Sequence, residues 1–249
     1  QLNALNKPLV RDISRYYITG LGATFHGQKT PHLRSIPINT EIVSDHPVLP
    51  YDDAAAIIRS KARISLAECF CRKAVSFSGK TCVHPLETCL QFDDFADYYV
   101  ENEMARTISV DEALSVLKQS QKEGLVIHIL NSQKVEAMCC CCSCCCGMLI
   151  SLKLFPAPSR AVKSNYHCLF EESLCTQCGV CVGRCAVGAL RMKDEKVHYS
   201  AECCIGCGLC VTDCPAGALT LVRKQESNLY VPPPTVFDTF NIMRREKAK

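Results

Sequence analysis

The sequence has little of what chemistry on a substrate requires. It shows no Ser/His/Asp order, no nucleotide-binding glycine loop and no paired acidic motif. It also has no C-x3-C-x2-C run with a free iron corner in a barrel pattern, as radical chemistry requires. The net charge is only +3, so there is neither a broad basic field for nucleic acid nor an acidic solvating tail.

Long hydrophobic runs are missing as well. The longest apolar run, Met138 to Ile150, is mostly cysteine and too short to span a bilayer. No signal peptide is visible at the start of the sequence. We therefore expect no direct membrane insertion, and any membrane contact would go through a partner.

What the sequence does have is cysteine, 21 of them in 249 residues. Secreted disulfide scaffolds are usually much shorter, and adjacent cysteines cannot easily pair into separate bridges. Clustered CxxC and CxC runs indicate metal binding instead. Metal-binding thiols need a reducing compartment, so we expect a cytoplasmic protein.

Two copies of C-x2-C-x2-C-x3-C lie between Cys175 and Pro215. This spacing is typical of cubane iron–sulfur sites, in which three thiolates of one run bind one cluster and the fourth thiolate binds the other cluster. Structural zinc sites are the alternative, but their CxxC pairs usually stand farther apart. The predicted ligands of one [4Fe-4S] cluster are Cys175, Cys178, Cys181 and Cys214, and those of the other are Cys204, Cys207, Cys210 and Cys185.

Residues 166–222 resemble the two-[4Fe-4S] bacterial-type ferredoxin family, because the turn after each cysteine run also repeats, at 186–190 and at 215–219. The resemblance implies a βαββαβ dicluster domain over residues 159–222. Two departures stand out. Ala186 replaces the usual Pro, and Cys203 is an extra thiol beside Cys204, although spacing favours Cys204 as the ligand.

For residues 1–158 we expect a cysteine-rich α/β domain, which makes the whole chain α+β. Asp52 or Asp53 can cap a helix, and a capping box of Ser109 and Glu112 opens another that ends at Gly124. A helix with Phe92, Phe95 and Tyr99 on one face is predicted before it, and a strand over residues 125–129 follows it, so helix, helix and strand occur in a winged-helix-like order. The helix that opens at Ser109 carries balanced charges and no basic stripe, so we expect no nucleic-acid binding.

Ten upstream cysteines are candidate metal ligands. A run with seven thiols, residues 139–146, fits an irregular loop around a cluster better than a strand or helix, which would place thiols on every face. The candidates are Cys69, Cys71, Cys82, Cys89, Cys139, Cys141, Cys142, Cys144, Cys145 and Cys146.

These upstream motifs, with the ferredoxin repeats, resemble a wider group of ferredoxin-like proteins that carry an extra cysteine-rich domain. The resemblance implies one or two further iron–sulfur clusters, although Cys140 replaces an Asn that is usual in the group. The simplest ligand set is Cys69, Cys71, Cys82 and Cys89, with the later run offering a second set or mixed ligation. A zinc knot and a redox switch of free thiols remain alternatives.

Two neighbouring side chains have open roles. His84 can ligate iron, form a hydrogen bond or lie at the surface, and Arg72 can balance an anionic cluster or be solvated. Residues 152–158 are typical of a linker. Residues 223–249 form a proline-containing tail with a short basic helix, either docked on a partner or solvated.

Together these features predict an iron–sulfur electron-transfer protein that relays single electrons to or from a larger oxidoreductase. Its partner would be a flavoprotein or another oxidoreductase subunit in a hetero-oligomeric complex, and the chain itself would be non-catalytic. One alternative is a reductase whose upstream cluster binds substrate. Another is a redox- or iron-sensing regulator built on the winged-helix-like segment, for which a segment before Gln1 could supply the DNA-binding part.

Overall fold

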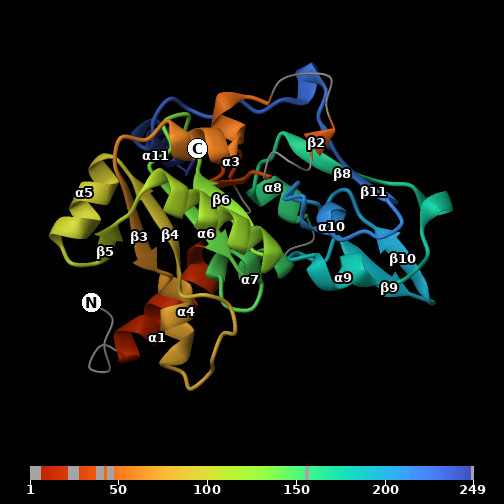
Figure 1. The fold of residues 1–249 in the computed structure, drawn as a ribbon, viewed down its shortest axis with the longest axis horizontal. Helices are drawn as coiled ribbons and strands as arrows, with labels where there is room; N and C mark the ends of the chain where they lie inside the picture. The colour runs from red at the N-terminus through yellow and green to blue at the C-terminus, as the bar shows by residue number, and fades with distance from the viewer. Residues whose placement is uncertain (1–6, 22–27, 38–41, 44–47, 155–156, 248–249) are drawn as a thin grey trace.

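The computed structural model describes residues 7–21, 28–37, 42–43, 48–154 and 157–247 (Figure 1). Mixed helices and strands confirm the predicted α+β class. A large sheet with its helices occupies one side of the molecule in Figure 1, and two small sheets with α9 and α10 occupy the other. No helix within these ranges combines the length and the apolar composition that crossing a membrane requires.

The upstream part is built on a six-stranded sheet in which every neighbouring pair of strands is antiparallel. In spatial order the strands are β1 (Leu33–Ser35), β6 (Val126–Leu130), β7 (Ala137–Cys141), β4 (Glu87–Phe92), β3 (Ile64–Glu68) and β5 (Ala105–Thr107). Most of the buried residues of the central strands alternate between the two faces, so both faces of the sheet are covered.

Two amphipathic helices cover one face of this sheet, α3 (Ala54–Arg59) and α6 (Val110–Lys122). Asp53 caps α3 by accepting from the Ala56 amide at 2.9 Å, and Ser109 caps α6 by accepting from the Glu112 amide at 3.1 Å, as their sequences predict. Leu117 of α6 packs with Leu90 and other buried apolar residues in the first hydrophobic core. The helices α5 (Asp94–Glu101), α4 (Phe70–Ser76) and α1 (Lys7–Tyr16), with the π-helical turn η2 (Tyr17–Leu21), complete this part.

The winged-helix-like interpretation of this region is wrong in its topology. Strand β5 separates α5 from α6, and β6 lies inside the large sheet between β1 and β7. The physical reason is burial. Val126, Ile127 and Ile129 are buried on opposite faces, so β6 needs a neighbour on each edge and cover on each side.

The second part has the predicted βαββαβ order. Its elements are β8 (Tyr166–Phe170), α9 (Val180–Arg184), β9 (Leu190–Lys193), β10 (Lys196–Tyr199), α10 (Leu209–Thr212) and β11 (Leu219–Arg223). β9 and β10 form a hairpin, and β8 pairs antiparallel with β11. The short strand β2 (Ile42–Val43) pairs parallel with β11, so residues from the first fifty complete the ferredoxin-like sheet across the predicted boundary at residue 158.

A second hydrophobic core joins the two parts. It lies on the other face of the large sheet and includes α7 (Gly147–Lys153) and α8 (Pro158–Ala161). Helix α7 ends and α8 begins within the predicted linker, residues 152–158. Part of that linker, residues 155–156, lies outside the described residues. Arg184 of α9 also donates hydrogen bonds to the carbonyls of Gln121 and Lys122 at the end of α6, where the helix dipole favours a cation.

The tail folds back onto its own chain. After the 3-10 turn η6 (Glu226–Asn228), helix α11 (Val236–Lys247) buries Met243 in the second core. Glu246 accepts from the amide and the hydroxyl of Thr30 at 3.0 and 2.7 Å, while Phe237 and Phe240 are exposed. One face of the tail helix is therefore docked within the molecule, which is neither of the two predicted arrangements. Two further 3-10 turns are η4 (Pro50–Asp52) and η5 (Glu172–Leu174).

A buried ion pair ties the N-terminal segment to both parts. Arg34 of β1 contacts the Asp52 carboxylate, and both side chains are at most 2% exposed. Asn165, just before β8, donates to the same carboxylate at 2.7 Å and accepts from the Tyr230 amide at 2.7 Å. Burial raises the pKa of Asp52, while Arg34 and Asn165 act in the opposite direction.

Replacing Arg34 by Met should leave the Asp52 charge buried without its cation. We expect the free energy of unfolding to fall by about 3–5 kcal/mol. Anaerobic urea unfolding followed by circular dichroism measures it. The control is Arg63→Met, which removes a half-exposed pair with Asp97 and should cost about 1 kcal/mol or less. Equal losses in the two variants would contradict the role of the buried pair.

Candidate iron–sulfur sites

A first cavity lies at the outer end of the ferredoxin-like part. Cys175, Cys178, Cys181 and Cys214 line it together. Cys178 is exposed and Cys181 is buried, and burial raises the pKa of Cys181 to about 11. The Gln177 amide donates to the Cys175 sulfur at 3.4 Å. The cavity thus brings together the four thiols that the sequence predicts for one cluster.

A second cavity lies nearer the large sheet. Its lining includes Cys185, Cys204, Cys207 and Cys210, the thiols predicted for the other cluster. The Ala189 amide donates to the Cys185 sulfur at 3.1 Å. Burial raises the pKa of Cys207 well above its ordinary value, so metal binding here must displace a proton.

Two positions of the backbone near the second cavity require or favour glycine. Gly206 has φ +65°, and a Cβ there would stand 2.3 Å from the Tyr166 carbonyl oxygen. Gly208, with φ +80°, caps the first turn of α10. These glycines let the chain bend tightly between ligands. With four thiols and amide donors to sulfur, each cavity has the donor set that a [4Fe-4S] cluster takes.

Two further thiols, Cys168 and Cys203, lie near the second cavity, and only Cys168 lines it. The sulfur of Cys168, which the sequence analysis did not select, lies 3.9 Å from that of Cys210, and the residue lines the second cavity. Its only sequence signal is a lone cysteine in an apolar strand. Cys203 lines a neighbouring surface depression instead, while Cys204 lines the cavity, as spacing favours.

Six upstream thiols contact one another in series, and three of them lie in the second hydrophobic core. We call this set the six-thiol pocket. Cys89 and Cys139, paired across β4 and β7, have sulfurs 3.8 Å apart. Side-chain contacts run from Cys69 to Cys71, then to Cys146, Cys141, Cys139 and Cys89.

Charge is unevenly shared within the six-thiol pocket. The Cys141 thiol hydrogen-bonds both Cys139 and Cys146, which lowers the pKa of each well below its ordinary value. The same contacts raise the pKa of Cys141. Two of the six sulfurs are thus stabilised as thiolates by their neighbours, which is the form that binds metal.

The prediction of an irregular loop over residues 139–146 is wrong for its first half. Residues 137–141 form strand β7, and only 142–146 turn before α7. Alternation along β7 sends Cys139 and Cys141 into the six-thiol pocket and Cys140 into the first hydrophobic core. Burial raises the pKa of Cys140 to about 12, consistent with a packing role.

His128 points at this pocket and was missed by the sequence analysis. It is fully buried on β6, and neither ring nitrogen has a hydrogen-bond partner among the described residues. Its ligand nitrogen and the sulfurs of Cys141 and Cys146 lie within 4.8 Å of one another. Burial lowers the pKa of His128 to about 4, so the ring is neutral and able to ligate. His84, in contrast, lies 3.4 Å from Glu123 near the surface.

Arg72 is the buried cation of the upstream part. Its guanidinium donates to the carbonyls of Pro85 at 2.6 Å and Cys140 at 2.9 Å, and also contacts the Thr88 hydroxyl. In the described ranges no carboxylate forms an ion pair with it. Burial acts to lower the pKa of Arg72, because it disfavours the charged form. A hydrogen bond with Cys142 and the charges of nearby thiolates outweigh burial, so the pKa of Arg72 is raised above its ordinary value. Arg72 therefore serves as the countercharge of an anionic thiolate site, one of its two predicted roles.

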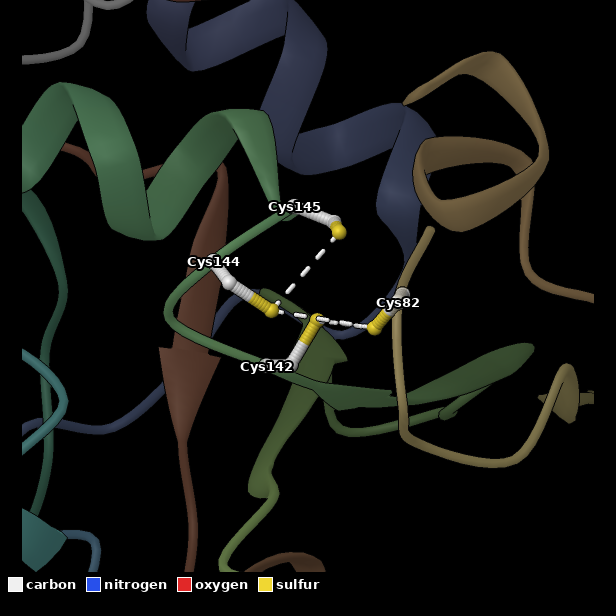
Figure 2. Close-up of side chains that lie close together, drawn as sticks. All are labelled: Cys82, Cys142, Cys144 and Cys145. Atoms are coloured by element: carbon white, nitrogen blue, oxygen red, sulfur yellow. Dashed lines mark hydrogen bonds between the residues drawn. The ribbon is translucent and has the colours of Figure 1, made fainter. Parts of the chain in front are cut away.

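The remaining upstream candidates form a separate group of four, shown in Figure 2. The sulfurs of Cys82, Cys142, Cys144 and Cys145 all lie within 4.8 Å of one another. We call them the four-thiol group. The structure thus assigns Cys82 to a different site from Cys69, Cys71 and Cys89, because sheet pairing places Cys89 beside Cys139. The simplest ligand set suggested by the sequence is not the one brought together.

Residues 174–218 match the family model of the 4Fe-4S dicluster domain. The match spans both cysteine runs and all eight cysteines predicted as ligands. This segment is thus similar to an iron–sulfur dicluster domain. No curated protein matches the chain.

Replacing Gly206 by Ala should disrupt the second cavity, because the added Cβ meets the Tyr166 carbonyl and the backbone is left-handed. We expect the iron content of anaerobically purified protein to fall by about four atoms per chain, the iron of one cubane. Gly183→Ala is the control, since a Cβ there has nothing within 4 Å. Full iron in the Gly206 variant would show that the close approach does not shape the site.

Proposed function

We propose that this protein transfers single electrons through a series of iron–sulfur centres to or from a larger oxidoreductase. One observation carries the proposal. The second hydrophobic core includes Cys139, Cys141 and Cys146 of the six-thiol pocket together with Cys185, Cys204 and Cys207 of the second cavity. The six-thiol pocket and the second ferredoxin-like cavity therefore share one apolar core.

The order of the sites supports a path for electrons across the molecule. The six-thiol pocket lies on the large sheet, the second cavity lies against the joining core, and the first cavity lies beyond it. Cys185 and Cys204 belong to both the second core and the third, which contains Cys181 and Cys214 of the first cavity. The three sites are thus linked in series by hydrophobic cores that share residues.

Iron–sulfur clusters supply one-electron transfer with little change of shape. The chain's own contribution is to hold the thiolates fixed, donate amide hydrogens to ligand sulfurs and exclude water. Amides of Gln177 and Ala189 donate to ligand sulfurs, which favours the reduced, more negative state. Val187, Ala189 and Leu190, which line the second cavity, are buried, and burial of a cluster shifts its reduction potential in the opposite sense.

A docking face for a redox partner surrounds the first cavity. Cys178 is exposed there, and so are the apolar side chains of Leu174, Val180 and Met192. Exposed apolar residues around a buried centre are typical of sites where a protein partner binds. We propose a flavoprotein or an oxidoreductase subunit as this partner, in a cytoplasmic hetero-oligomeric complex in which the chain is non-catalytic.

The relay is tested by interrupting it at Cys207. With a reduced flavoprotein as donor, the Cys207→Ala variant should reduce its upstream iron more slowly than the wild type, because the middle site has lost a ligand. Stopped-flow absorbance with freeze-quenched paramagnetic resonance measures both rates. The control is Cys203→Ala, whose thiol lies outside the second cavity. An unchanged rate in the Cys207 variant would contradict the proposed series.

The six-thiol pocket is tested separately through His128. Replacing it by Leu keeps the ring's approximate bulk and removes its nitrogen atoms. We expect an altered resonance spectrum from the upstream centre, with the two ferredoxin-like cubanes and their roughly eight iron atoms unchanged. Iron and acid-labile sulfide counts with resonance spectra measure this. The matched control is His84→Leu, at the surface. Identical spectra in both variants would remove His128 from the site.

A further inference from the structure

We propose that the four-thiol group, Cys82, Cys142, Cys144 and Cys145, binds a single divalent zinc ion rather than an iron–sulfur cubane. The site would be tetrahedral and structural. It is separate from the electron-transfer centres, so the proposal stands or falls independently of the proposed function.

The distances between sulfurs carry the argument. Cys82 lies 3.9 Å from Cys142 and 3.7 Å from Cys144, and Cys144 lies 3.7 Å from Cys145, as Figure 2 shows. A tetrahedral zinc site with Zn–S bonds of about 2.3 Å places its sulfurs about 3.8 Å apart. The observed spacing is therefore that of four thiolates around one ion.

A cubane needs a wider arrangement, because each thiolate binds a different iron corner. The cysteines of the ferredoxin-like part are less tightly grouped. Although Cys175 and its three companions surround one cavity, none of the eight cysteines of the two ferredoxin-like cavities belongs to a group of three with sulfurs within 4.8 Å. Within the described ranges the four-thiol group is the one set of four cysteines that meets this criterion.

Disulfide bonds do not account for the spacing. An S–S bond is about 2.05 Å long, far shorter than any of these separations. Neutral thiols account for the contacts but not for the charge, since Arg72 lies buried beside Cys142 without a carboxylate partner in the described part of the chain. Four thiolates on a divalent ion carry a net charge of about −2, which a buried cation offsets.

The place of the four residues suggests what the ion does. Cys82 lies in the loop over residues 77–86, between α4 and β4, and the other three lie in the turn between β7 and α7. The loop also holds the carbonyl of Pro85, to which Arg72 donates, and it leads directly to Cys89. An ion here would hold this loop against the turn.

The experiment counts metals in the anaerobically purified full chain. We expect one zinc per chain in the wild type and in the Cys203→Ala control. Cys82→Ala and Cys144→Ala should lose the zinc and keep the wild-type iron content. Cys144 is exposed, so its replacement by Ala disturbs little of the core. A loss of about four iron atoms with no zinc present would overturn the proposal in favour of a cubane.

A second measurement keeps the test decisive if these variants do not fold. Zinc-edge X-ray absorption on the wild-type protein should show four sulfur neighbours at about 2.3 Å. A mixed nitrogen and sulfur shell would assign the zinc to the pocket that contains His128 and overturn the proposal. A protein without zinc, or one with a single iron bound to these four sulfurs, would overturn it too. None of these outcomes changes the test of the relay, which follows electron transfer at Cys207.

Discussion

Alternation of side chains along β7 is the constraint on which both halves of the molecule depend. Met138 and Cys140 face the first hydrophobic core, whereas Cys139 and Cys141 face the six-thiol pocket. A slip of one residue in the register between β7 and β4 would exchange these faces and separate Cys139 from Cys89. The apolar core under α3 and α6 therefore holds the thiols in place, because it leaves β7 only one register that buries Met138.

Buried sulfur charge is the second organising feature. The upstream part buries its thiols fully or partly, Cys144 excepted. It supplies Arg72 as a cation at the place where the two groups of thiols approach. The ferredoxin-like part has no comparable guanidinium among the residues lining its two cavities, apart from Arg184, and relies on amide donors and tight glycine turns. Two ways of stabilising anionic metal centres thus occur in one chain, one through a side-chain charge and one through backbone dipoles.

What the sequence predicts well is local. Three of the four thiols of each ferredoxin-like site lie within a run of seven residues, so covalent spacing alone brings those three together. The helix cap at Ser109 likewise depends on a residue three positions away. The grouping of the upstream thiols is not local. Cys89 meets Cys139 only through the pairing of β4 with β7, a register that no short window of sequence contains. His128 escaped notice for a similar reason, because a histidine in an apolar strand reads as an ordinary buried residue until its neighbours across the sheet are known. The sequence argues against a strand at β7, because a strand places thiols on both faces. In the structure Cys140 packs in the first core on one face, and Cys139 and Cys141 belong to the six-thiol pocket on the other.

The pairing of β2 with β11 has a consequence for how the chain is assembled in time. Ile42 is aligned with Leu221 and Val43 with Val222, so β2 pairs with a strand that is synthesised much later in the chain. All six strands of the large sheet have been synthesised by residue 141, before β11 exists. The large sheet is accordingly able to form first. The small sheet of β2, β11 and β8 closes only after β11 has been made.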